Sequence, residues 1–389
     1  MLFFQRYKIA KFGPMKNIYL DNASTTALRP EVITEMTKVL TENFGNPSSS
    51  HAFGRSSKNL IELSRKSIAK QLNCNAKEII FTSCGTEANN FIILSCIRDL
   101  KVNRIITSKI EHHAVLHTIE VFQKQFDIQV DYVNILEDGT VDYNDLEELL
   151  NDDKKTLVSL MHVNNEIGTV LNLEKVVSLC KNNNAYFHTD TVQSIGKTKI
   201  DLTELPIDFL VASAHKFHGP KGIGFAFIRK QIVLQPLLLG GEQEKGLRAG
   251  TESVHNIVGM AKALEISFEK LEQEKIKVSK LKRYLIEQLN LNFTEISFAG
   301  NPEDTFYNVI NVILPFDENK TSMLLFQLDM NGIAVSRGSA CQSGSVKPSH
   351  VLKAFLPKEL LQKPNIRVSF SHNNTKDDID YLIDILKKI

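Results

Sequence analysis

Residues 208–222, Asp-Phe-Leu-Val-Ala-Ser-Ala-His-Lys-Phe-His-Gly-Pro-Lys-Gly, join a short apolar run to a polar loop. The run predicts a buried strand that ends at Ser213, and the loop follows at its carboxyl end. Lys216 is unusual there, because a lysine amine is strongly hydrated and costly to desolvate. A desolvated amine is the usual nucleophile for a carbonyl group. Lys216 is therefore a candidate Schiff-base lysine. Lys221, in a Gly-Pro-Lys-Gly turn, competes with it, and we expect Lys221 to be exposed.

Strands and helices alternate on both sides of this segment. Short apolar runs predict further strands at 78–82, 104–108, 156–162, 185–189 and 222–228. Helical patterns lie at 86–100, 112–125 and 173–182. Apolar strands that alternate with helices are typical of a mainly parallel sheet covered by helices on both faces. The sequence therefore predicts an α/β fold.

The pattern changes after residue 250. Residues 251–290 are rich in Glu, Lys, Leu and Ile without a sustained heptad, which predicts one or two surface helices. Strands at 309–313 and 366–370 follow, and the chain ends in a helical pattern at 376–389. We expect a large domain over residues 15–265 and a smaller α+β domain over residues 266–389. The strand at 17–20 opens the large domain, and packing of the first residues of that domain on the small domain is an open alternative.

Residues 1–14 form an N-terminal extension in this interpretation. They carry Arg6, Lys8 and Lys11 and no acid, so a transit peptide is an open alternative. Met15 precedes the first strand and is a second possible start.

Composition excludes several classes of protein. The 389 residues include 46 basic and 45 acidic side chains, a net charge of +1, which argues against direct nucleic-acid binding. No apolar run approaches the ~20 residues that cross a bilayer. The cysteines are odd in number and widely spaced, and no two form a CxxC pair. This pattern argues against a disulfide framework and against a zinc site. It favours reduced thiols in the cytoplasm. They are Cys74, Cys84, Cys96, Cys180 and Cys341.

Three more polar clusters lie where predicted strands end, which is where open parallel sheets bind ligands. In Thr82-Ser-Cys-Gly-Thr-Glu87, Gly85 and Thr86 precede a helix and can donate backbone N–H groups to a phosphate. The same residues could instead simply cap the helix. Glu111-His112-His113 offers an imidazole, although a histidine at a strand end is more often structural.

The third cluster is His188-Thr-Asp-Thr-Val-Gln193. Asp190 can pair with a cation or a protonated ring nitrogen, or it can cap the next helix. A phosphate cradle, an imidazole, a carboxylate and a lysine are together the parts that bind pyridoxal 5'-phosphate.

The sequence from Ile18 to Ile389 resembles the cysteine desulfurases of the NifS/IscS type, which are class V, fold-type I pyridoxal-phosphate enzymes. The motifs that carry the resemblance are Tyr19-Leu-Asp-Asn-Ala-Ser-Thr-Thr26, Phe44-Gly-Asn-Pro-Ser48, Thr-Glu-Ala-Asn-Asn from Thr86, His162-Val-Asn-Asn-Glu-Ile-Gly168, Asp190 with Gln193, Ala214-His-Lys216 with Gly219-Pro-Lys-Gly222, Arg248-Ala-Gly-Thr251, and Ser336-Arg-Gly-Ser-Ala-Cys-Gln-Ser-Gly-Ser345. The resemblance implies a fold-type I transferase, with a large mainly parallel-sheet domain and a smaller α+β C-terminal domain.

The resemblance also implies a role for each site residue. Lys216 holds the cofactor aldehyde, His112 stacks on its ring and shuttles protons, Asp190 pairs with the pyridinium nitrogen, and Gln193 contacts the phenolic oxygen. The phosphate is bound by Gly85, Thr86, Ser213 and His215, with Thr251 supplied by the partner subunit of a homodimer. Asn165 and Arg367 hold the substrate carboxylate, which suits the guanidinium fork of arginine.

Cys341 is the nucleophile that the resemblance implies. The small residues around it argue against the alternative of a packing thiol. The implied reaction converts L-cysteine to L-alanine and leaves a persulfide on Cys341. The sulfur then passes to an acceptor protein for iron–sulfur cluster assembly or tRNA thiolation. Selenocysteine lyase, class V aminotransferase and a non-catalytic scaffold are the alternatives.

The sequence departs from the common family pattern at a few positions. Cys84-Gly85 stands where Gly-Ala is frequent, Arg337 where Ser is usual, and Gln342 where Thr is usual. The chain stops at Ile389, without the tail that docks the iron–sulfur scaffold in the housekeeping members. The acceptor of sulfur is therefore left open.

Overall fold

The computed structural model describes residues 17–338 and 349–389. The predictions for the extension at 1–14 and for Cys341 fall outside these ranges. Within them, no helix has the length and apolar content that crossing a membrane requires.

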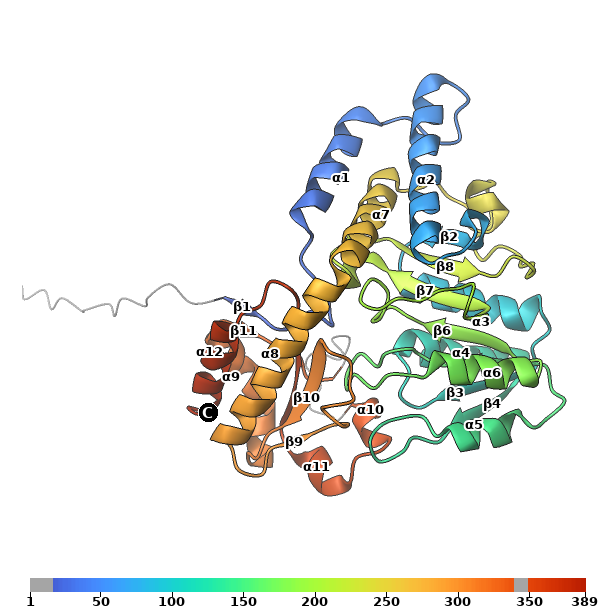
Figure 1. Ribbon diagram of the computed structural model, residues 1–389. Coiled ribbons are helices and arrows are strands. Elements are labelled where there is room, and N and C mark those ends of the chain that lie inside the picture. The colour runs from blue at the N-terminus through green and yellow to red at the C-terminus, as the bar shows by residue number, and fades with distance from the viewer. Residues whose placement is uncertain (1–16, 339–348) are drawn as a thin grey trace, which may run out of the picture.

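The larger part of the described chain is built around a seven-stranded sheet (Figure 1). Its order is β2-β8-β7-β6-β5-β3-β4. The strands are β2 (Ile79–Thr82), β3 (Arg104–Ser108), β4 (Gln129–Val133), β5 (Thr156–Ser159), β6 (Tyr186–Asp190), β7 (Phe209–Ser213) and β8 (Gly224–Ile228). β8 runs antiparallel to both its neighbours, and the other pairings are parallel. The mainly parallel α/β sheet is confirmed.

Helices cover both faces of this sheet, each over its own hydrophobic cluster. Helices α3 (Gly85–Arg98) and α4 (His113–Phe126) pack on one face. The other face carries α2 (Ala52–Gln71), α5 (Tyr143–Leu150), α6 (Leu173–Asn182) and α7 (Val254–Glu269), and α1 (Pro30–Glu42) packs on α7. Strands covered in this way are buried on both sides, which explains their nearly continuous apolar sequences.

The expectation of surface helices over 251–290 is wrong for α7. Ten of its sixteen residues are buried, because it packs against both α1 and α2. Helix α8 (Leu271–Asn292) follows directly and matches the expectation better, since its Glu- and Lys-rich face stays exposed.

The C-terminal part has a hydrophobic cluster of its own, which includes α8 from Val278 onward. It contains an antiparallel sheet in the order β12-β10-β9, and β1 pairs in parallel with β11. Its elements are β1 (Ile18–Tyr19), β9 (Ser297–Phe298), β10 (Val309–Ile313), α9 (Thr321–Met330), β11 (Ile333–Ala334), α10 (His350–Lys353), α11 (Lys358–Gln362), β12 (Asn365–Ser369) and α12 (Lys376–Leu386). Residues Ile18 and Leu20 belong to this cluster although they lie more than 250 residues before α8 in the chain. The domain boundary at residue 265 stays a proposal.

Strand direction decides where ligands can sit. Since β2, β6 and β7 point the same way, their last residues meet at one edge of the sheet. Thr82, Asp190 and Ser213 are those last residues. The polar loops after these strands therefore converge.

Candidate active site

A cavity of about 230 Å³ opens at this edge of the sheet. Ten of the twelve predicted site residues line it, namely Gly85, Thr86, His112, Asn165, Asp190, Gln193, Ser213, His215, Lys216 and Arg367. Cys341 lies outside the described residues. Thr251 is exposed and does not line the cavity of its own chain. The roles assigned to these residues remain predictions.

Lys216 ends a short 3-10 helix, Ala214–Lys216, that follows β7. Its Nζ donates hydrogen bonds to the carbonyl oxygens of Ala23 and Ser24, both at 2.7 Å. Gln193 Nε2 donates to the same Ala23 oxygen at 2.8 Å. Two backbone carbonyls thus hold the amine in the cavity. The sequence motif at 19–26 pointed to this segment, but not to its contact with Lys216.

Asp190 is the last residue of β6 and is 5% exposed. Its Oδ2 accepts a hydrogen bond from Asn89 Nδ2 at 2.8 Å, and its Oδ1 accepts one from the backbone N–H of Val192 at 2.9 Å. The side chain therefore stabilises the following turn, where no helix begins, and it also lines the cavity, while its pairing with a ring nitrogen stays a prediction. Asn89 was missed as a site residue, although it lies in the motif that begins at Thr86.

His112 precedes α4 as its N-cap residue, with Nδ1 accepting from the N–H of Ala114 at 3.1 Å. Burial lowers the pKa of His112 and the Lys216 amine lowers it further, while Asp190 opposes the shift. The ring is therefore neutral at pH 7. Because Nδ1 accepts a bond, the proton of the neutral ring is assigned to Nε2.

Gly85 is the first residue of the fourteen-residue helix α3. A Cβ at Gly85 would lie 2.8 Å from Val192 Cγ2, so a larger residue would crowd this end of the cavity. His215 lies nearby, and its Nδ1 is 3.1 Å from Thr25 Oγ1. Burial, and then Lys216, lower the pKa of His215 to about 4. The site therefore offers helix N–H groups and neutral side-chain donors, which suit a phosphate.

Arg367 lies in the middle of β12 and is 1% exposed. Its Nη1 donates to the carbonyl oxygen of Asn165 at 2.8 Å. Its Nη2 donates to Asp21 Oδ1 at 2.8 Å and to Ser24 Oγ at 2.5 Å. Asp21 balances the buried charge and fixes the guanidinium. Sequence reasoning missed Asp21, although the first motif contains it.

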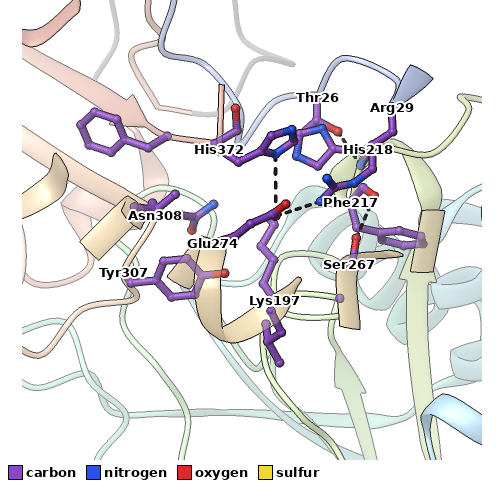
Figure 2. A pocket seen from close by; sticks show the side chains of 15 residues that line it. Thr26, Arg29, Lys197, Phe217, His218, Ser267, Glu274, Tyr307, Asn308 and His372 are labelled. Atoms are coloured by element: carbon purple, nitrogen blue, oxygen red, sulfur yellow. Dashed lines mark hydrogen bonds and ion pairs between the residues drawn. The ribbon is translucent and has the colours of Figure 1, made fainter. Parts of the chain in front are cut away.

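A second, smaller cavity of about 30 Å³ is lined by Phe217 and His218, which follow Lys216 in the chain (Figure 2). Arg29 Nη2 pairs there with Glu274 Oε2 at 2.8 Å, and His372 Nδ1 is 3.7 Å from the same oxygen. Lys197 is buried beside them, and its Nζ donates to the carbonyl oxygen of Gln193 at 3.1 Å. Burial, and then Lys216, lower the pKa of Lys197 to about 7. Sequence reasoning did not single out any of these residues.

Comparisons with known proteins agree on one family. The family model described as aminotransferase class-V matches residues 18–382. The chain is 42% identical over 377 residues to cysteine desulfurase IscS from Clostridium botulinum, covering 96% of this chain and 94% of that one. Among solved structures, a NifS-like protein matches with a TM-score of 0.88 at 35% identity, over 96% of this chain and 99% of the other. SspA in complex with cysteine matches with a TM-score of 0.79 at 31% identity, over 91% and 99%. The chain belongs to the class-V aminotransferase family, and within that family to the cysteine desulfurases.

Proposed function

We propose that the cavity around Lys216 is the active site of a pyridoxal 5'-phosphate-dependent cysteine desulfurase. The enzyme converts L-cysteine to L-alanine and leaves a persulfide on Cys341. One observation carries the proposal: a lysine amine, a buried carboxylate, a neutral imidazole and the start of a long helix share one cavity. Each of them matches a different part of the cofactor.

The residues present fit the cofactor. The start of α3 at Gly85, where a Cβ would collide with Val192, leaves room for a phosphate group beside backbone N–H donors. The Asp190 carboxylate, held by Asn89, suits a protonated ring nitrogen. Lys216 lines the same cavity and is the residue that would hold the aldehyde. When bound, the cofactor supplies an electron sink for negative charge that develops at the substrate α-carbon.

Substrate binding falls to Arg367 and Asn165 in this proposal. Asp21 and Ser24 fix the guanidinium of Arg367 before any substrate arrives, so little reorganisation is needed to receive a carboxylate. The relative SspA, solved in complex with cysteine, supports a cysteine-sized amino acid as the ligand.

Proton transfer falls to Lys216 and His112. Lys216 Nζ takes the proton from the substrate α-carbon, and the carbonyls of Ala23 and Ser24 orient this amine. His112 is neutral because burial lowers its pKa, and it holds a proton at Nε2 that it can deliver within the cavity.

Cys341 completes the reaction. Its thiolate attacks the substrate sulfur, forming an S–S bond while the Cβ–S bond breaks. The electron pair of the broken bond stays with Cβ, which is then protonated to give L-alanine. The products balance the reactants: a thiol and L-cysteine give a persulfide and L-alanine.

The partners of the chain are part of the proposal. Thr251 is exposed and lies outside its own cavity, as expected for a residue that serves the second subunit of a homodimer. An acceptor protein for iron–sulfur cluster assembly or tRNA thiolation receives the sulfur. A cytoplasmic location, which the reduced thiols favour, also remains a proposal.

Replacing Cys341 tests this function. The holoenzyme of C341A should release no sulfide from L-cysteine in the presence of a reducing thiol, yet keep the absorbance of a lysine-bound cofactor. C180A is the matched control, because Cys180 is a buried thiol on α6 away from the cavity. Undiminished desulfuration by C341A would contradict the proposal.

Two assays separate the related enzymes on this fold. Turnover of L-selenocysteine but not L-cysteine would identify a selenocysteine lyase. Dependence on an amino acceptor would identify an aminotransferase. A protein that binds no pyridoxal 5'-phosphate would be a scaffold.

A further inference from the structure

Glu166 is a buried acid beside the cavity that the proposed reaction does not use. It follows Asn165 in the chain, is 0% exposed and does not line the cavity. Its backbone N–H donates to Asn164 Oδ1 at 2.8 Å, and the Asn164 amide donates to the carbonyl oxygen of Ile110 at 2.8 Å. The turn that carries Glu166 is therefore fixed, and so is the direction from which its carboxylate leaves the backbone.

Two positions distant in sequence meet at this carboxylate. Ser349 Oγ donates a hydrogen bond to Glu166 Oε2 at 2.5 Å. Gly338 lies beside both: a Cβ placed on it would be 3.4 Å from Ser349 Cβ and 3.5 Å from Glu166 Oε2. Gly338 also has a φ of +71°, which favours glycine.

Gly338 and Ser349 flank residues 339–348, the segment that contains Cys341. The two flanks are tied further to the active site. The backbone N–H of Arg367 donates to the carbonyl oxygen of Ser336 at 2.7 Å, and His350 Nε2 lies 2.9 Å from the carbonyl oxygen of Glu111. Both ends of the segment are thus joined to the elements that supply Arg367 and His112.

The contact with Ser349 is more than a helix cap. As the N-cap residue of α10, Ser349 needs only to accept the N–H of Val351, which it does at 3.0 Å. Its hydroxyl proton is directed instead to Glu166. Burying a carboxyl group costs desolvation free energy unless its hydrogen bonds offset that loss. An apolar side chain of the same volume would not carry this desolvation penalty.

We propose that Glu166 is a positioning residue that, through Ser349, fixes the C-terminal flank of the Cys341 segment beside the substrate carboxylate site. The inference rests on the proposed role of Cys341. Asn165, which precedes Glu166, and Arg367 bind the substrate, so one rigid turn sets both the substrate and the base of the segment that carries the nucleophile.

Four variants of the holoenzyme test the inference. S349A removes the hydroxyl that binds Glu166, and S349T keeps it. E166Q replaces the carboxyl group of Glu166 with an amide. E78Q is the matched control, because Glu78 is also buried and accepts backbone hydrogen bonds, from Asn75 and Lys230, but lies away from the cavity.

We expect S349A and E166Q to lower kcat for L-cysteine about tenfold or more, with KM and the absorbance of the bound cofactor unchanged, because a displacement of about 1 Å can cost 10²-fold. S349T and E78Q should match the wild type. A raised KM with normal kcat, or equal rates in S349A and S349T, would overturn the inference.

A second readout does not depend on turnover. The rate at which N-ethylmaleimide alkylates Cys341, followed by mass spectrometry of its peptide without substrate, should rise at least about threefold in S349A and E166Q, because a misplaced segment changes the exposure of its thiol. Equal alkylation rates in all variants would overturn the positioning role. If wild-type protein forms no persulfide on Cys341, the proposed function fails instead, and the alkylation rates still decide whether Glu166 holds the segment.

Discussion

Two cavities lined by neighbouring residues of the Lys216 loop contain similar side chains but differ in volume and in charge balance. The larger, of about 230 Å³, lies where parallel strands end and contains Lys216, His112 and Arg367. The smaller, of about 30 Å³, contains Lys197, His218 and Arg29 (Figure 2). A space of that size holds about one water molecule.

The charges of the smaller cavity are used within the protein. Arg29 is neutralised by Glu274, and His218 Nδ1 lies 2.8 Å from the carbonyl oxygen of Ala27. These contacts join the N-terminal segment, α8 and the chain after β12. Titratable residues alone therefore do not mark an active site. A cavity large enough for a ligand, placed at the carboxyl ends of the strands, distinguishes the larger one.

The two buried lysines give the sharpest contrast. K216A should lower turnover of L-cysteine by at least about 10³-fold, because it removes both the cofactor attachment and the proton acceptor. K197M should stay within about tenfold of the wild type, because methionine fills the same volume without the desolvation cost of an amine. Steady-state rates of sulfide release measure both. An equal loss in K197M would show that the second cavity takes part in catalysis.

Breaking the Arg29–Glu274 pair should affect stability rather than chemistry. R29M leaves a mostly buried carboxylate without its partner and should lower the free energy of unfolding by about 2–3 kcal/mol, discounted because Glu274 is 20% exposed. The double variant R29M/E274Q should recover most of this loss. Urea unfolding of the holoenzymes gives the values. Cofactor affinity should not change, and a large fall in that affinity would contradict a purely structural role.

The pH dependence of stability separates Lys197 from its surroundings. Its pKa falls from 10.5 to about 7 on folding, so between these values the unfolded chain binds a proton that the folded protein does not. Stability from this group is therefore present above pH 10.5 and is lost as the pH falls to about 7. Relative to K197M, the wild type should gain about 1.4 kcal/mol of unfolding free energy per pH unit inside this window. A flat difference would show that Lys197 stays charged when buried.

Sequence reasoning succeeded where local patterns carry the information. Strands such as 209–213 are buried on both faces and are therefore apolar throughout, so they can be recognised directly. Nine of the ten cavity residues lie at or after strand ends or in the quoted motifs, whereas Arg367, in the middle of β12, was identified from the resemblance alone. Their convergence follows from the shared direction of the strands.

The missed features depend on distant contacts. Arg65 and Ser64 lie on the buried face of α2 and break its apolar period, since Arg65 is paired with Glu244, 179 residues away. Asn89 acts through Asp190, 101 residues away. The burial of α7 depends on α1 and α2 packing against it. No local pattern reveals such partners.

One measurement tests the central claim most directly. Wild-type holoenzyme is mixed with one equivalent of L-cysteine, digested, and analysed by mass spectrometry for peptides that have gained one sulfur atom. The account predicts the added sulfur on the peptide that contains Cys341, together with one equivalent of L-alanine, and neither product from K216A. Alanine formed with the sulfur on another cysteine, such as Cys84 at the edge of the cavity, would contradict it.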